Sequence, residues 1–395
     1  MRLPLFLLSF LLLLAIPASG DEVFFEVIRE RRCTVSEMID EFVAEFGSQI
    51  DTVPLRNEIR LAKRIGRPCR FVALRYRTTL PDGSPVEASG LLAFPDRGRF
   101  KGTVEVSPVS KDKSKCGSKQ LFASEAFLPA FLGYVALIPD LLGFGLTEAW
   151  DNCYLMADQS VRMGVDFRLA ANAWFKSEMG RELPARTVLM GYSLGANGAL
   201  ALAREYVSHP ELGVKPKALF LGSGPYDPRL ALESMLTSGR MDYMLYPGIV
   251  RSLNAYCDAN LDPADLFQPS ILVHWEEVSG GWEDPTVLAE RYGTDLHAYL
   301  HPDFFREGYN PTIRRLFDVL ETLTVLQPDD PLPAGLYVRL RHSAADNIVP
   351  VACTDRLYRQ WHKPLDNVHY RRHRTDTHYD QGAQTYIDLM LYLLR

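Results

Sequence analysis

The sequence of 395 residues lacks any long basic run, and its net charge is small. Its 43 lysine and arginine residues stand against 49 aspartate and glutamate residues, which gives a formal charge of −6. Proteins that bind nucleic acid usually present a basic patch, and polybasic segments are typical of proteins that bind anionic membranes. We therefore expect no nucleic-acid partner, and a small uncharged or weakly charged substrate fits this composition better.

Long apolar runs are also scarce, and the only long one lies at the N-terminus (3–16). Arg2 precedes this run and small residues follow it (17–20), a pattern typical of a secretory signal peptide. Its ~14 residues fall short of the ~20 that a membrane-spanning helix needs. We expect a cleaved signal peptide (1–20), a secreted or periplasmic mature chain that begins near Asp21, and no transmembrane segment after cleavage.

The six cysteines form no C-x-x-C pair, so the spacing typical of a metal site is absent. The sequence therefore predicts neither a metal nor another cofactor. In an exported protein, six cysteines allow up to three disulfides and 15 different pairings. We expect at least two of the cysteines to be bridged. They are Cys33, Cys69, Cys116, Cys153, Cys257 and Cys353.

The chain has no internal repeat, but its character changes near residue 70. The segment 21–70 is charged and predicts a mainly helical lead-in. Two strand-like runs follow (71–79 and 86–94), and the turn sequence between them (80–84) contains proline and glycine, which predicts a hairpin. A third strand is expected at 103–109.

Helical and strand-like segments then alternate, which predicts an α/β core (71–228 and 334–395) with a mostly parallel sheet and helices on both faces. The segment between these parts (229–333) lacks strand alternation and has several proline and glycine breaks, so we expect a helical insertion. It would act as a lid over the site, or else form a plain second layer of core. The expected strands are 134–139, 187–190, 218–221, 336–340 and 368–373, and the expected helices are 122–132, 159–175, 196–206, 351–361 and 382–394.

Residues 191–195 read Gly-Tyr-Ser-Leu-Gly and lie between a predicted strand and a predicted helix. A sharp strand-to-helix turn presents a serine hydroxyl for attack and leaves room only for small neighbours such as glycine. Ser193 is therefore the candidate nucleophile. The free backbone N–H of Leu194 at the helix start is a candidate oxyanion donor. Taken alone, this segment also fits an ordinary turn.

A serine nucleophile needs an imidazole base and a carboxylate that orients the base. Asp346 follows a predicted strand at the sheet edge where sites of open α/β sheets lie, although an ordinary surface aspartate is the alternative. The chain order serine, acid, histidine leaves only the histidines after Asp346 as candidates for the base. His378 falls in the loop before the last predicted helix, from which it can reach Ser193, and His373 is the second choice. The other two histidines that follow Asp346 are His362 and His369.

Together these motifs resemble the α/β-hydrolase superfamily from about residue 71 to the C-terminus. The resemblance rests on the 191–195 turn, on 133–145 as the fourth strand with its loop, and on 346–350 as the acid turn. The signal peptide, the Pro-Asp-Gly hairpin turn and the helical insertion are most similar to secreted lipases of the fungal lipase A type and their bacterial relatives. The resemblance implies an α/β-hydrolase fold with a helical lid and the hydrolysis of esters.

In that group an aspartate after the third strand assists the oxyanion hole, and Asp112 is similar in placement. The resemblance also implies a disulfide between this region and the lid, which corresponds to Cys116 and Cys257. The chain departs from the group at Ser343, where many relatives have glycine, and in the third-strand loop, which bears two extra lysines. These departures leave the three catalytic candidates in place but leave the substrate open.

We therefore expect an exported serine hydrolase that cleaves carboxylic esters of small molecules or lipids through an acyl-enzyme intermediate. Ser193 would attack, His378 would transfer the proton, and Asp346 would orient His378. A serine peptidase or amidase of the same fold is one alternative, since the same side chains cleave amides. The other is a hydrolase-fold binding protein without activity.

Overall fold

The computed structural model describes residues 23–46, 63–64, 66–109, 112–121, 124–326, 332, 335–362 and 365–395. The predicted signal peptide (1–20) and part of the predicted lead-in lie outside the described residues. Within the described part of the chain, no helix is both long and apolar enough to cross a membrane.

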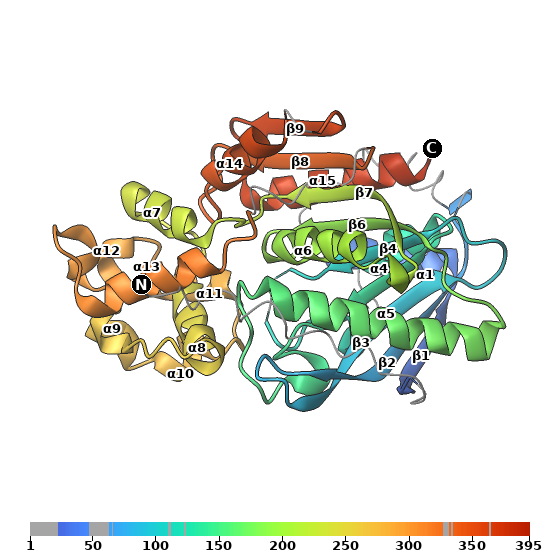
Figure 1. The fold of residues 1–395 in the computed structure, drawn as a ribbon, viewed down its shortest axis with the longest axis horizontal. Helices are drawn as coiled ribbons and strands as arrows, with labels where there is room; N and C mark the ends of the chain where they lie inside the picture. Colours follow the sequence, from blue (N-terminus) through green and yellow to red (C-terminus); the bar gives the residue numbers. More distant parts are fainter. Residues whose placement is uncertain are drawn as a thin grey trace, which may run out of the picture.

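A nine-stranded sheet forms the centre of the fold (Figure 1), with the strand order β1-β2-β3-β5-β4-β6-β7-β8-β9. The first four strands in this order pair antiparallel, and every later pair is parallel. The predicted mostly parallel sheet is therefore confirmed, and so is the predicted hairpin, which is β2-β3. The strands are β1 (Phe25–Cys33), β2 (Cys69–Thr79), β3 (Pro85–Pro95), β4 (Thr103–Ser107), β5 (Val135–Pro139), β6 (Arg186–Tyr192), β7 (Lys215–Gly222), β8 (Tyr337–Ser343) and β9 (Val368–His373).

Helices cover both faces of the sheet because successive apolar side chains of a strand point to opposite sides. In β7, Phe220 packs into the same apolar cluster as Leu389 of α15. The preceding residue, Leu219, packs with Leu200 of α6 on the other face of the sheet. The helices around the sheet are α1 (Val35–Phe46), α3 (Gly117–Gln120), α4 (Ser124–Phe131), α5 (Ala157–Met179), α6 (Leu194–Ser208), α14 (Ala352–Trp361) and α15 (His378–Leu393).

A group of helices lies between β7 and β8 in the chain and forms a separate body beside one end of the sheet, at the left of Figure 1. These helices share a large apolar cluster of their own. Ile348 and Val349 of the β8–α14 loop belong to that cluster, and Leu194 packs against it. The helices are α7 (Pro228–Ser238), α8 (Tyr246–Tyr256), α9 (Pro269–Leu272), α10 (Trp275–Ser279), α11 (Pro285–Tyr292), α12 (Leu296–Tyr299) and α13 (Pro311–Thr322).

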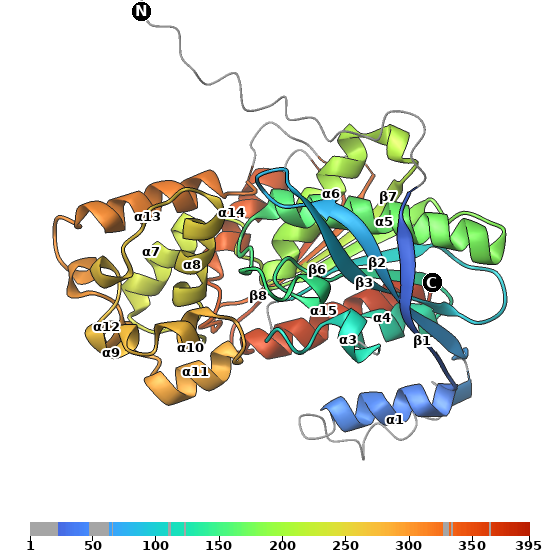
Figure 2. The ribbon, with the colours of Figure 1, turned by 90° about the horizontal axis from the view of Figure 1, so that it is seen from below.

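The N-terminal part of the described chain differs from the expected helical lead-in, because residues 25–33 form β1 at the edge of the sheet (Figure 2). Most side chains of β1 are exposed, as the charged residues of this segment require. Glu30 pairs with Arg70 of β2 at 2.8 Å, which holds the strand in register across the pair. Charge on an edge strand is also a common protection against pairing with other chains.

All six cysteines are free thiols, so the disulfides expected from the sequence, including Cys116 with Cys257, are not formed in this structure. Cys257 lies close to Cys153 instead. Burial, with a contribution from the nearby Cys257, raises the pKa of the Cys153 thiol to about 12. Cys33 and Cys69 face each other directly across β1 and β2.

Candidate active site

Ser193 lies at the sharp turn between β6 and α6, where its backbone φ of 54° and ψ of −129° are unusual for a residue other than glycine. Its N–H donates to Gly222 O at 2.8 Å, which ties the turn to β7. A Cβ on Gly191 would lie 2.0 Å from Gly195 O, and one on Gly195 would lie 2.2 Å from Ser107 O. The turn therefore needs glycine on both sides of Ser193, as the sequence predicts.

His378 is the first residue of α15, and not part of a loop as the sequence analysis expects. Thr377 caps the helix in a reciprocal pair with Asp380, so the start of the helix is firmly defined. The Tyr192 hydroxyl donates to His378 O at 2.7 Å, and the two rings lie 4.9 Å apart between centroids. These contacts hold the imidazole in place rather than leaving it mobile.

The structure brings together the three side chains that the sequence predicts as catalytic. His378 Nε2 lies 3.0 Å from Ser193 Oγ, and His378 Nδ1 lies 2.7 Å from Asp346 Oδ2. Because the carboxylate can only accept, Nδ1 carries the hydrogen and the lone pair of Nε2 faces the Ser193 hydroxyl. Ser193 is partly exposed, whereas His378 and Asp346 are buried.

The Asp346 carboxylate is held by donors on both of its oxygens. Oδ1 accepts from the backbone N–H groups of Ile348 and Val349, both at 2.9 Å. Burial of the carboxyl opposes its ionisation, but the charge of His378 and hydrogen bonds from His342 and His378 outweigh burial. They hold the pKa of Asp346 well below its usual range, so the group is an anion beside the imidazole.

His342 contacts the acid, although it precedes Asp346 in the chain and therefore falls outside the order serine, acid, histidine that selects the base. Its side chain is fully buried, with Nε2 2.8 Å from Val349 O and 3.2 Å from Asp346 Oδ2. Both partners are acceptors, so Nε2 carries a hydrogen that both share. Nδ1 lies 2.7 Å from Thr354 Oγ1, which fixes the ring from the other side. The four-residue spacing to Asp346 is the only sign of this contact in the sequence.

His373, the second choice for the base, is engaged elsewhere. Arg341 Nη1 donates to His373 Nε2 at 2.9 Å, and His373 Nδ1 lies 3.0 Å from Asp376 Oδ2. Both ring nitrogens therefore have partners other than Ser193.

The two predicted oxyanion residues occupy different surroundings. Leu194 is the first residue of α6, where a backbone N–H has no partner within the helix. Asp112 accepts from the hydroxyl of Ser114 and from Ser114 N, the latter at 3.0 Å, and pairs with Lys115 Nζ at 2.9 Å. Burial opposes ionisation of Asp112, but these donors lower its pKa, so the carboxylate is an anion and cannot donate to an oxyanion. A donor from this loop would have to be a backbone N–H.

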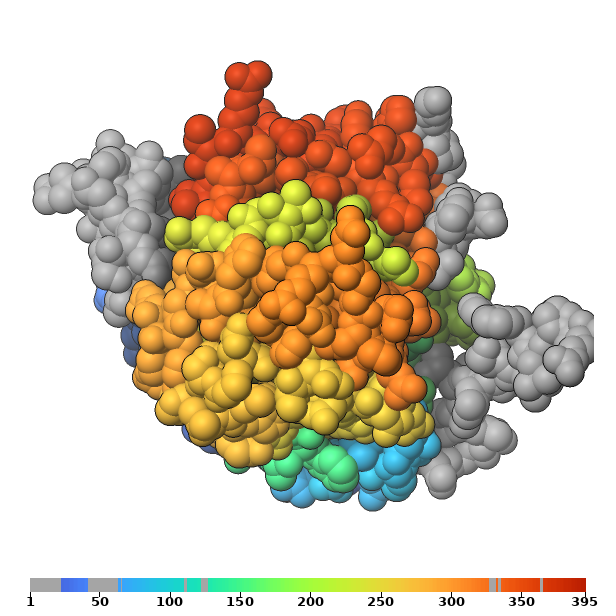
Figure 3. All heavy atoms as spheres, turned by 90° about the vertical axis from the view of Figure 1, so that its left-hand side faces the viewer, coloured from blue at the N-terminus to red at the C-terminus, as the bar shows by residue number. Residues whose placement is uncertain are grey.

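The segment between β7 and β8 contacts the residues that follow the acid and the base of the site. The Asp242 N–H donates to Asn347 O at 3.1 Å, and Thr286 Oγ1 lies 2.6 Å from the hydroxyl of Tyr379. Asn347 and Tyr379 directly follow Asp346 and His378 in the chain. Figure 3 views the molecule from this side and shows the helices, in yellow and orange, across the middle of the face.

The sequence matches no protein-family model and no curated protein. Its structure is similar to that of the rice cell wall degrading esterase LipA from Xanthomonas oryzae, with a TM-score of 0.72 and 18% identity over 96% of this chain and 97% of that chain. It is also similar to lipase A from Candida antarctica in its closed state, with a TM-score of 0.58 and 14% identity over 90% of this chain and 78% of that chain. The predicted α/β-hydrolase fold is therefore confirmed over nearly the whole chain.

Proposed function

We propose that this protein is a serine hydrolase that cleaves carboxylic esters. One observation carries the proposal: two hydrogen bonds join Ser193 to His378 and His378 to Asp346 in the orientation that a general base requires. The similarity in fold to an esterase and a lipase supports the same chemistry.

In the proposed reaction, Ser193 Oγ attacks the carbonyl carbon of the ester while its proton passes to His378 Nε2. The Leu194 N–H and a backbone N–H of the Asp112 loop would stabilise the oxyanion of the tetrahedral intermediate. The imidazolium then gives its proton to the leaving alcohol, and an acyl group remains on Ser193. Water, activated by the same imidazole, releases the acid. Asp346 keeps its negative charge throughout and stabilises the imidazolium. These steps need no cofactor.

We further propose that α7 to α13 act as a lid that shapes the acyl pocket and keeps water out. This segment contacts the residues next to Asp346 and His378, and its apolar cluster reaches Ile348, Val349 and Leu194. An apolar surface so close to Ser193 favours uncharged acyl chains of small esters or lipids. The apolar segment at the N-terminus supports a secreted or periplasmic location.

The test compares Ser193→Ala with Ser208→Ala, since these serines lie at the two ends of α6 and Ser208 is exposed. On p-nitrophenyl esters, we expect Ser193→Ala to lower kcat by roughly 10⁴-fold or more and Ser208→Ala to leave it unchanged. Full hydrolysis by Ser193→Ala would refute the proposal. Aminoacyl amides tested beside the esters distinguish an esterase from a peptidase, and hydrolysis of neither substrate favours a binding protein.

A further inference from the structure

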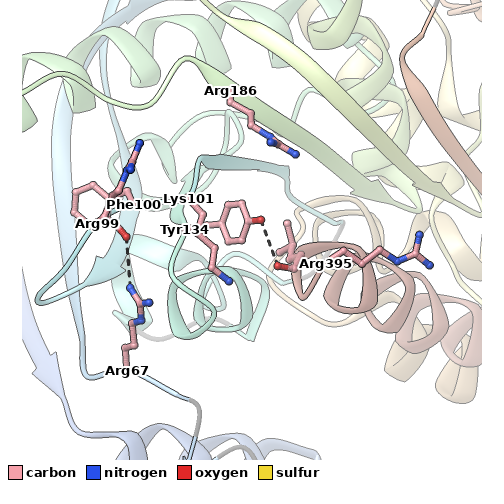
Figure 4. Close-up of a pocket in the computed structure, with 8 residues that line it drawn as sticks. Arg67, Arg99, Phe100, Lys101, Tyr134, Arg186 and Arg395 are labelled. Atoms are coloured by element: carbon pink, nitrogen blue, oxygen red, sulfur yellow. Dashed lines mark hydrogen bonds between the residues drawn. The ribbon is translucent and has the colours of Figure 1, made fainter.

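A basic hollow lies at the end of the sheet opposite to Ser193. Its volume is about 490 Å³, and its lining contains five basic side chains (Figure 4). Four of them, Arg67, Arg99, Lys101 and Arg186, come from the body of the chain, and the fifth is Arg395. The sequence shows no basic run here, because these residues come from segments far apart in the chain. The fold alone brings them together.

The hollow is separate from the candidate active site. Arg186 is the first residue of β6, and Ser193 directly follows the last. A strand of this length spans about 23 Å at roughly 3.3 Å per residue. A ligand in the hollow would therefore not touch the three catalytic candidates.

The four cations have no acidic partners in the described part of the chain, where none of them lies within 4.0 Å of a carboxylate oxygen. Other arginines of the protein do pair, for example Arg70 with Glu30 at 2.8 Å. Unpaired like charges that share one hollow repel one another, and a bound anion would relieve this repulsion. The concentration of positive charge is the more notable because the whole chain carries a formal charge of −6.

Among the four cations, Arg67 has the side-chain position that is best defined by its neighbours. Its Nη1 donates to Arg99 O at 3.4 Å. A Cβ on Gly98 or Gly133 would lie 3.3 or 3.4 Å from the same nitrogen, and both glycines have a φ of +100°. These two glycines therefore leave space for the guanidinium, whose other N–H groups stay available to a ligand.

Tyr134 forms a rigid wall between the cations. Its ring is buried, its hydroxyl donates to Leu393 O at 3.3 Å, and Lys101 Nζ lies 5.7 Å from the ring centroid. Arg186 and the Tyr134 ring both flank Gly102, where a Cβ would lie 2.9 Å from Arg186 O and 3.4 Å from Tyr134 Cδ1. Burial raises the pKa of Tyr134, and the charge of Arg186 opposes this rise. Figure 4 shows Arg67, Lys101 and Arg186 around this ring.

We propose that the hollow binds a compact anion that carries two or more phosphate groups. Guanidinium groups match the paired oxygens of a phosphate, and Lys101 adds a point charge beside them. Such a ligand is either a free polyphosphate or the phosphorylated headgroup of a lipid. The proposal does not depend on the hydrolase activity.

The test is calorimetric titration of the full chain with pyrophosphate at low salt. We expect the Arg67→Gln/Arg186→Gln double variant to bind at least tenfold more weakly, because it loses two guanidinium groups whose hydrogen bonds to phosphate are charge-assisted. Arg181→Gln is the matched control, since Arg181 stacks on Phe100, 4.1 Å from the ring centroid, and does not line the hollow. We expect this control to bind within about twofold of the wild type, well inside the tenfold that corresponds to 1.4 kcal/mol.

Thermal unfolding without ligand checks that each variant is folded. If the double variant does not fold, Lys101→Gln replaces it in the binding test, because Lys101 is exposed. Co-sedimentation with phosphatidylcholine vesicles, with and without phosphatidylinositol bisphosphate, distinguishes a lipid headgroup from a free anion. The proposal is overturned if the wild type binds neither pyrophosphate nor the vesicles that contain the bisphosphate lipid. The proposal is also overturned if Arg181→Gln weakens pyrophosphate binding as much as the hollow variants do. That result would indicate a general attraction of the anion to a basic surface.

Discussion

The imidazole of His342 lies 3.2 Å from the carboxylate of Asp346, and the side chain is completely buried. Its Nε2 hydrogen is shared between that carboxylate and Val349 O, and it reaches Oδ2, the same oxygen of Asp346 that His378 Nδ1 contacts. We infer that His342 is a positioning residue, since it touches the acid and not the proposed substrate.

We predict that His342→Ala lowers kcat roughly tenfold to hundredfold while KM stays nearly constant. The lost hydrogen bond to a charged group is worth about 1.5–3 kcal/mol, and each 1.4 kcal/mol corresponds to tenfold in rate. His342→Gln can still donate an N–H and is expected to recover most of the rate. Steady-state kinetics on a p-nitrophenyl ester measures kcat and KM for each variant. Equal rates for His342→Ala and the wild type would show that the contact does not support Asp346.

Gly195→Ala tests the geometry of the turn. Its Cβ would lie 2.2 Å from Ser107 O, so Ser193 must move, and a shift of about 1 Å costs roughly hundredfold in rate. Gly83→Ala is the control: its φ of +85° is strained for alanine, at about 1–2 kcal/mol, but no atom is within 4 Å. We expect only Gly195→Ala to lose activity. Normal turnover by this variant contradicts the geometry described.

The pKa of Asp346 predicts a pH dependence of stability. Because folding lowers this pKa, the stabilising contribution is fully present well above the unfolded value of about 3.9 and is lost as the pH falls toward the folded value. Urea unfolding of the wild type and Asp346→Asn at pH 7 and pH 3 measures the difference in free energy. We expect the advantage of the wild type to shrink at pH 3. A free-energy difference between wild type and Asp346→Asn that increases from pH 7 to pH 3 would contradict the lowered pKa of Asp346.

Oxidation of the thiols tests the corrected cysteine arrangement. We expect a glutathione disulfide buffer to join Cys33 to Cys69 and Cys153 to Cys257. Directly opposed residues of antiparallel strands have Cα atoms about 4.5–5.5 Å apart, within the range of a disulfide. Peptide mapping without reduction identifies the pairs. A bridge between Cys116 and Cys257 would instead support the pairing that the family resemblance implies.

The sequence predicts those parts of the fold whose signals are local. The turn at 191–195 is recognisable because a strand, two glycines and a helix start are contiguous, and the parallel core follows from alternating segments. β1 is missed because its charged residues suit an exposed edge strand as well as a helix. The start of α15 at His378 depends on the Thr377 cap, which a search for apolar periodicity does not detect.

Contacts between distant segments are not visible in the sequence. The segments that carry Cys153 and Cys257 are joined by the Tyr256 hydroxyl, which donates to Asp151 O at 2.8 Å, because the helical insertion folds back against the β5–α5 region. Likewise, Arg67 and Arg186 share a hollow only because β2 and β6 run in the same direction and both begin at the same edge of the sheet. Position after a predicted strand selects Asp346, and chain order together with the place before the last helix selects His378, but neither signal connects His342 with Asp346.

The central claim is that Ser193 is a nucleophile activated by His378. Treatment with a fluorophosphonate followed by mass spectrometry of the peptides tests it most directly. The account predicts one covalent adduct, on Ser193, which forms far more slowly in His378→Ala. An adduct on another residue, or no adduct on the folded wild type, would contradict it.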